Sequence, residues 1–194
     1  PAVIYDSFGI LGVKARRFER INRTHWAESS RARPHALFII QIGGNDLQAW
    51  HRVKTSTYKR QFRQVIELFQ HARPEAACMI MSPHDHGSRT HGGGIKSYRG
   101  QAGIVAAQRE VALDAGCAWF SMFEATGGLD SVAQMFRDKE IAADLRHLRR
   151  RGARRLGHLF VDALERGLER WRRARPCKRE LPVSLNQSVS EESG

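Results

Sequence analysis

The stretch "ALFIIQIGGNDLQ", residues 36–48, combines the two patterns that decide the fold. Its apolar first part predicts a buried β-strand over residues 36–42. The strand runs into two glycines, which allow a tight turn and a close backbone approach to a ligand, and then into Asn45 and Asp46. The side-chain amide of Asn45 can donate to an oxyanion at the end of the strand, although Gly-Gly-Asn-Asp also makes an ordinary turn.

Further strands and helices are expected to alternate around this stretch. Apolar runs predict buried strands at 2–7, 77–82 and 117–122. Apolar residues recur at helical spacing over 57–73, 101–116 and 150–173. The alternation predicts an α/β fold, a three-layer α/β/α sandwich with a mostly parallel sheet, and we expect the last helix to cover one face of that sheet. In such sheets, sites form at the carboxyl ends of the strands.

Length and composition are those of one ordinary domain. The 194 residues, 41% of them hydrophobic, suffice for a core, and we expect the domain over residues 1–175. Residues 176–194 turn to Ser, Glu, Asn and Gln and predict a disordered tail or a linker. The net charge of +12 is compatible with nucleic acid, an anionic membrane surface or an anionic cell-wall polymer as partner. Many arginines fall on the polar face of the last helix, however, where a solvated surface explains them.

The cysteines and the ends of the chain say little about the compartment. Cys78, Cys117 and Cys177 lack C-x-x-C spacing and are odd in number, so neither a zinc cluster nor a full disulfide framework is predicted. Cys78 and Cys117 lie in apolar runs and are expected to pack as small hydrophobic residues. No membrane span or signal peptide is visible. Because the sequence opens at Pro1 on an expected strand, we expect it to begin inside a larger protein.

A second polar pattern, "AADLRHLRRRG" at 142–152, places Asp144 three residues before His147. A carboxylate at this spacing can bind one imidazole nitrogen and leave the other free as a general base. The alternative is that Asp144 caps the last helix and that His147 is one polar residue in a basic stretch.

Taken together, the order of these blocks resembles that of the SGNH (GDSL-like) hydrolase family over residues 3 to 172. The third block, G-x-N-D, is matched at Gly43 and Asn45, and the last, D-x-x-H, at Asp144 and His147. The stretch "YDSFGILGVKARR" is similar to the second block, in which a glycine N–H meets the oxyanion, and Gly12 stands at the expected distance before Asn45. Ser7 follows no glycine-aspartate pair and lies too near Asn45 to be the nucleophile, so the nucleophile block is expected to be missing.

The resemblance implies a set of site residues. His147 would be the base, Asp144 its partner, and Gly12 and Asn45 the oxyanion hole, with Gly43 and Asp46 supporting the loop. The family implies no cofactor and no metal. The loop "SPHDHGSRTHGGG" nevertheless holds His84 and His86, which could bind a transition metal, contact the substrate or simply be solvated.

Three aromatic residues are weighed as sugar contacts: Trp50, Tyr98 and Trp119. Trp119 lies within an expected strand and is assigned to the core, whereas Trp50 follows the G-x-N-D loop and is the better candidate for a substrate contact.

The function expected from the resemblance is a serine esterase that hydrolyses O-acyl groups, chiefly acetyl, on a carbohydrate or cell-wall polymer. One alternative is a non-catalytic carbohydrate-binding module with the same fold but no nucleophile. The other is nucleic-acid binding by the arginine-rich helix, which is disfavoured because no reader motif is present. The partner is thus expected to be a small-molecule or polysaccharide ester, with no nucleic acid and no membrane span. The family makes an extracytoplasmic location plausible, and the oligomeric state is not predicted.

Overall fold

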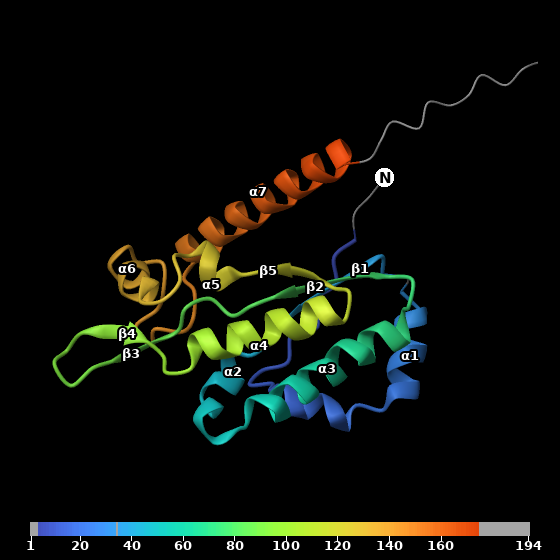
Figure 1. Ribbon diagram of the computed structural model, residues 1–194, viewed down its shortest axis with the longest axis horizontal. Coiled ribbons are helices and arrows are strands. Elements are labelled where there is room, and N and C mark those ends of the chain that lie inside the picture. Colours follow the sequence, from blue (N-terminus) through green and yellow to red (C-terminus); the bar gives the residue numbers. More distant parts are fainter. Residues whose placement is uncertain (1–3, 34, 175–194) are drawn as a thin grey trace, which may run out of the picture. The chain divides into compact units, whose positions relative to one another are not determined.

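Three of the expected strands pair in one parallel sheet. The computed structural model describes residues 4–33 and 35–174 and orders the sheet β1-β2-β5 (Figure 1). The strands are β1 (Leu37–Gln41), β2 (Ala77–Met81) and β5 (Ala118–Phe120). The short strands β3 (Gly87–Arg89) and β4 (Ile95–Ser97) form a separate antiparallel hairpin within the histidine-rich loop. The parallel α/β fold predicted from the sequence is confirmed.

Helices connect the strands. The 3-10 helices are η1 (Ala15–Arg20) and η2 (Trp50–Arg52). The α-helices are α1 (Arg23–Arg31), α2 (Gly44–Leu47), α3 (Thr55–Ala72), α4 (Gln101–Asp114), α5 (Met122–Ala125), α6 (Ser131–Arg137) and α7 (Arg150–Ala174). Within the described residues, no helix has the length and apolar content of a membrane span.

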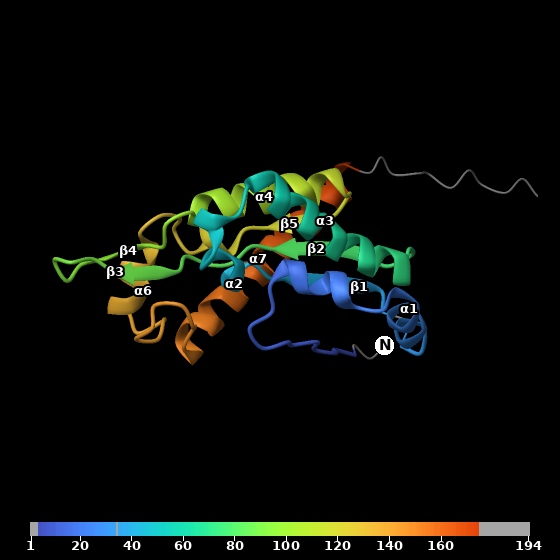
Figure 2. The ribbon, with the colours of Figure 1, turned by 90° about the horizontal axis from the view of Figure 1, so that it is seen from below.

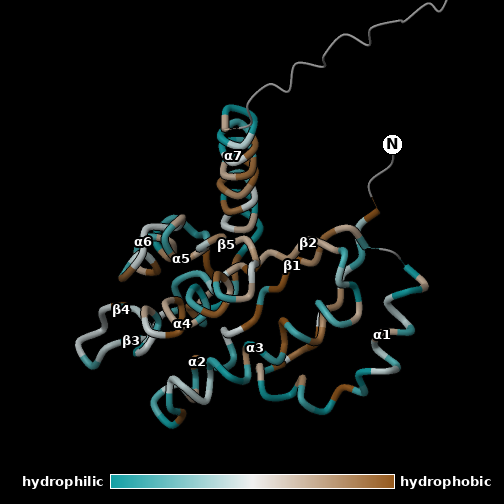
Figure 3. Tube along the Cα trace, turned by 45° about the vertical axis from the view of Figure 1, so that its right-hand side comes forward, coloured by the Kyte–Doolittle hydropathy of each residue, from teal (hydrophilic) through white to brown (hydrophobic). Residues whose placement is uncertain are grey.

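One face of the sheet packs against α3 and α4, which lie on the same side of it in Figure 2. Phe38, Ile40 and Ile80 point to this side and are buried, together with the apolar stripe of α3 that includes Phe62 and Ile66. The strands carry apolar residues along their length (Figure 3). Burial of this stripe explains why the helical spacing in the sequence predicted α3 correctly.

The other face of the sheet meets the first part of α7. Register pairs Met81 with Phe120 on this face, and the ring of Phe120 lies 5.1 Å from that of Phe160. Leu156 is also buried. A helical layer on each side of the sheet makes the three-layer α/β/α sandwich. The chain divides into two units after Phe160, so the expected cover is described for the beginning of α7 only.

The strand expected at the start of the chain does not form. Residues 1–3 lie outside the described residues, and 4–10 have no regular secondary structure. Ile4 and Tyr5 are more than 80% exposed, at 82% and 84%. Asp6 instead binds Arg33 and His35, with oxygen-to-nitrogen distances of 2.5 and 3.0 Å. The apolar run therefore has no sheet neighbour in the described chain, and side-chain contacts fix it.

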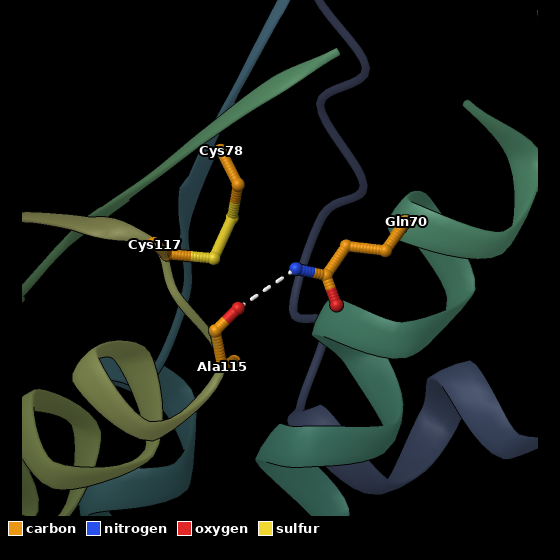
Figure 4. Close-up of a disulfide and its surroundings, with 4 residues drawn as sticks. All are labelled: Gln70, Cys78, Ala115 and Cys117. Atoms are coloured by element: carbon orange, nitrogen blue, oxygen red, sulfur yellow. Dashed lines mark hydrogen bonds between the residues drawn. A yellow bond between two sulfur atoms is a disulfide. The ribbon is translucent and has the colours of Figure 1, made fainter. Parts of the chain in front are cut away.

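The cysteine prediction was also wrong. Cys78 and Cys117 form a disulfide, with Cα atoms 4.7 Å apart (Figure 4). Met79 pairs with Ala118, so the parallel register places the preceding residues side by side, which the sequence separation of 39 hides. Cys177 and the expected tail at 176–194 lie outside the described residues.

Candidate active site

The loop that carries Asp144 and His147 is fixed by backbone contacts. Ile141 and Leu148 form an antiparallel bridge, and the Ala142 N–H donates to the His147 carbonyl at 2.8 Å. Between them Leu145 adopts a positive φ of 59° and buries its side chain in the apolar cluster with Val132. The strained backbone of Leu145 is thus held by burial of its side chain.

Asp144 makes three hydrogen bonds within this loop. Its Oδ1 accepts from the backbone N–H groups of Arg146 and His147 at 3.0 and 3.1 Å, and its Oδ2 lies 2.5 Å from Nδ1 of His147. These bonds, above all the one from the His147 side chain, lower the pKa of Asp144 to about 2. The carboxylate is therefore ionised at neutral pH.

The imidazole of His147 is oriented and accessible. Asp144 holds its Nδ1, while its side chain is 82% exposed. Among the residues that the structure describes, none forms a hydrogen bond to Nε2. A histidine with one nitrogen bound to a carboxylate and the other free can accept a proton from a nucleophile.

The glycines after β1 are required by close packing. Gly43 has a φ of 114°, and a Cβ there would lie 2.5 Å from Nε2 of Gln108. That amide donates to the Ile42 carbonyl and to the Tyr58 hydroxyl, both at 2.8 Å. The turn after β1 therefore packs tightly against the core, and the chain continues from it into α2, which contains Asn45 and Asp46.

Asn45 and Asp46 both bind the segment before η1. Asn45 is half-buried, and its Nδ2 donates to the Val13 carbonyl at 3.2 Å. Asp46 is 9% exposed, and both its carboxylate oxygens lie 3.2 Å from the Ala15 N–H. Burial raises the pKa of Asp46, and the hydrogen bond from Ala15 acts against that rise.

The structure brings Gly12 next to the Asn45 loop. Gly12 is exposed, has a φ of 67°, and immediately precedes Val13, whose carbonyl binds the Asn45 side chain. Ser7 is exposed, and no hydrogen bond between Ser7 and His147 occurs in the described part of the chain.

His84 and His86 follow β2. They contact the loop that carries His147 and the turn after β1. The Nε2 of His84 lies 2.8 Å from the Arg146 carbonyl, and since a carbonyl only accepts, this nitrogen carries the proton. The ring centroids of His84 and His86 are 4.8 Å apart, and His86 packs against Gly44. Burial lowers the pKa of both histidines, that of His86 to about 3. No group of three or more His, Cys, Asp or Glu in residues 4–33 and 35–174 is placed to hold a metal.

A pocket of 310 Å³ opens beside His147. It lies at the carboxyl ends of β1 and β2, the edge at which parallel sheets place their sites. Its lining residues are Gln41, Met81, His84, Met122, Arg146, His147, Leu148, Ala153, Leu156, Gly157 and Phe160.

Trp50, the candidate for a substrate contact, does not line this pocket. Its ring packs edge-on against Tyr58 at 5.2 Å, and a Cβ at Gly100 would lie 2.2 Å from it. Trp119 packs on the core, as predicted. The ring of Tyr98 lies 5.5 Å from the guanidinium carbon of Arg146.

The sequence interpretation missed part of the pocket. Arg146 stands between the two residues of the D-x-x-H pattern, so its position was visible, but its direction was not. One wall of the pocket is formed by α7 and depends on how that helix packs against the sheet. In the sequence, only the apolar spacing of this helix indicated such a contact.

No protein-family model matches the chain, and no curated protein sequence does. Solved structures do match. Over 81% of this chain the structure is similar to a peptidoglycan O-acetylesterase, with a TM-score of 0.73 and 18% identity, and the match covers 45% of that protein. The chain therefore spans less than half the length of that esterase.

Two further structures show the same likeness. One is an acetylxylan esterase from Geobacillus stearothermophilus, with a TM-score of 0.55, 17% identity and coverage of 78% of this chain and 67% of the other. The second is a GDSL-like lipase from Parabacteroides merdae, with a TM-score of 0.58, 15% identity and coverage of 78% and 68%. The described chain has the fold of the SGNH (GDSL-like) hydrolases.

Proposed function

We propose that the chain carries the base and the oxyanion hole of a serine esterase that removes O-acyl, chiefly acetyl, groups from a carbohydrate or cell-wall polymer. The observation that carries the proposal is the Asp144–His147 pair, with Nδ1 bound at 2.5 Å and Nε2 free, at the carboxyl edge of the parallel sheet. The fold supports it, because similar structures include proteins described as O-acetylesterase and acetylxylan esterase.

In this mechanism His147 Nε2 takes the proton of a serine hydroxyl as the serine oxygen attacks the ester carbonyl. Asp144 keeps the proton of the imidazole on Nδ1 and stabilises the imidazolium. The carbonyl oxygen becomes an oxyanion, which the Gly12 N–H and the second N–H of the Asn45 amide can meet. The carbon–oxygen bond to the alcohol then breaks, the imidazolium protonates the leaving alcohol, and the acyl group remains bonded to the serine. Water, activated by His147 in the same way, releases the acid and restores the serine.

We assign the nucleophile to a serine outside this sequence, in a segment that precedes Pro1. Ser7 is the candidate within the chain, but it is exposed and lies in a segment without regular structure. If no such serine exists, the same fold would act as a carbohydrate-binding module.

The test compares this chain with the translation product of its whole open reading frame. We expect the latter to release acetate from acetylated xylo-oligosaccharides, and His147→Ala to lower kcat by about a thousandfold or more. His158→Ala is the matched control, because His158 is exposed on α7 and lies outside the pocket. Activity that survives His147→Ala would refute the assigned base. Saccharide binding without acetate release from either protein would favour the binding module.

A further inference from the structure

Arg146 holds a guanidinium at the pocket beside His147. The residue is half-buried and lines the pocket, and its guanidinium carbon lies 5.5 Å from the ring centroid of Tyr98. Its backbone is fixed from both sides, because its N–H donates to Asp144 and its carbonyl accepts from His84. These contacts fix the backbone from which the Arg146 side chain extends, and Asp144 also binds His147.

No carboxylate neutralises this guanidinium within the described residues. The pocket lining contains no acidic side chain. Asp144 is the nearby carboxylate, and its oxygens are used by His147 and by two backbone N–H groups. A cation beside an apolar wall and without a counter-ion is arranged to receive an anionic group of a ligand.

The histidines around the pocket bring no negative charge that would neutralise Arg146. His84 lines it, and His86 packs against His84. Burial keeps His86 uncharged at neutral pH, and the neighbouring Arg146 contributes to the low pKa of His86. Arg146 thus supplies the permanent positive charge of the pocket lining, since Asp144 is bound to His147 and lies outside that lining.

The rest of the pocket has the chemistry of a saccharide site. One wall is apolar and is built by Met81, Met122, Leu156 and Phe160. An apolar wall with an aromatic ring can pack against the C–H face of a sugar, while a guanidinium binds a carboxylate through paired N–H donors.

We propose that Arg146 binds a carboxylate on the sugar, so that the esterase selects acyl esters of carboxylate-bearing saccharides over those of neutral ones. This proposal rests on the proposed function, and it adds the chemical class of the substrate and the residue that selects it.

Binding can be tested without turnover by following backbone and arginine side-chain NMR signals of this chain during titration. The probes are a trimer of galacturonic acid and the methyl ester of the same trimer, in which methylation removes the negative charges and leaves the rest of the saccharide unchanged. We expect the acid to bind about tenfold more tightly than the ester, as one charge-assisted contact allows. Arg146→Gln should abolish the difference, and Arg146→Lys should keep part of it.

Arg149→Gln is the matched control, because Arg149 is exposed, carries the same charge and does not line the pocket. It should leave the preference unchanged. Equal affinity for acid and ester, or a preference that survives Arg146→Gln, would overturn the proposal. Sodium acetate is a third probe, and acetate binding as tight as that of the trimer would show a simple anion site instead of a saccharide site.

The two proposals fail in distinguishable ways. Acetate release that needs His147 but shows no Arg146-dependent preference for the acid would refute this inference alone. Arg146-dependent binding of the acid without acetate release would refute the esterase and leave an anionic-saccharide site.

Discussion

Asp46 is a buried carboxylate that joins two distant parts of the candidate site. It follows Asn45 in α2, and its oxygens accept from the Ala15 N–H, three residues after Gly12. Asn45 donates a hydrogen bond to the Val13 carbonyl in the same segment. The proposed oxyanion donors therefore depend on a carboxylate that itself takes no part in the reaction.

Removing this acceptor should destabilise the protein and loosen the Gly12 segment. We expect Asp46→Ala to lower the free energy of unfolding by about 1–3 kcal/mol, because the buried Ala15 N–H loses its acceptor. Asp46→Asn keeps an acceptor and should cost less. Urea unfolding of the three proteins measures both effects. Equal stability of Asp46→Ala and the natural protein would show that the hydrogen bond from Ala15 to Asp46 does not stabilise the fold.

The pH dependence of this difference follows from the raised pKa of Asp46. The folded state binds the proton more tightly than the unfolded state, so the stability gained from protonation is present below the ordinary carboxyl pKa of 3.8 and is lost as pH rises through the folded pKa. The natural protein should thus lose stability relative to Asp46→Asn between pH 3.5 and pH 7. A relative gain over this range would contradict the assignment.

At the scale of elements, strand β2 is joined by a disulfide to the residue before β5, and the two strands also pair by hydrogen bonds. The Cys78–Cys117 disulfide closes a loop that contains α4, and Gln70 of α3 donates to the Ala115 carbonyl beside it at 2.9 Å (Figure 4). The bridge therefore fixes the helix between these strands against the sheet.

Loss of this bridge should lower stability without changing the fold. The sequence separation of 39 predicts that the double variant Cys78→Ala, Cys117→Ala loses about 2–4 kcal/mol of unfolding free energy. Cys177→Ala is the control and should unfold like the natural protein. The measurement is urea unfolding together with a count of free thiols in denaturant. Three free thiols in the natural protein purified without reductant would contradict the bridge.

The elements also show what sequence patterns can predict. Strands β1 and β2 and helices α3 and α4 were predictable because each buries a stripe whose spacing is local. The strand expected at 2–7 has the same apolar content, but a strand also needs a neighbour, and Asp6 binds side chains instead. The Asp144–His147 pairing follows from a three-residue spacing, whereas the disulfide and the direction of Arg146 depend on register and packing between distant segments.

At the scale of the whole molecule, burial is uneven along the chain. Helix α3 buries seven residues, whereas the buried residues of α7 are Gly152 and Leu156, both near its beginning. Beyond Phe160, α7 exposes Val161, Leu164 and Leu168 and carries Arg166 and Arg170. Segments with few buried contacts open locally at low free-energy cost.

Limited trypsin digestion should therefore cut α7 after Arg166 or Arg170 before it cuts α3 after Arg60 or Arg63. The reason is that a protease needs an unfolded stretch of chain, and α3 must leave the core to supply one. Mass spectrometry of early time points identifies the cuts, and a protease that cuts after glutamate provides the control, since Glu165 and Glu67 lie on the same two helices. Cleavage in α3 that precedes cleavage in α7 would contradict the expected order of local opening.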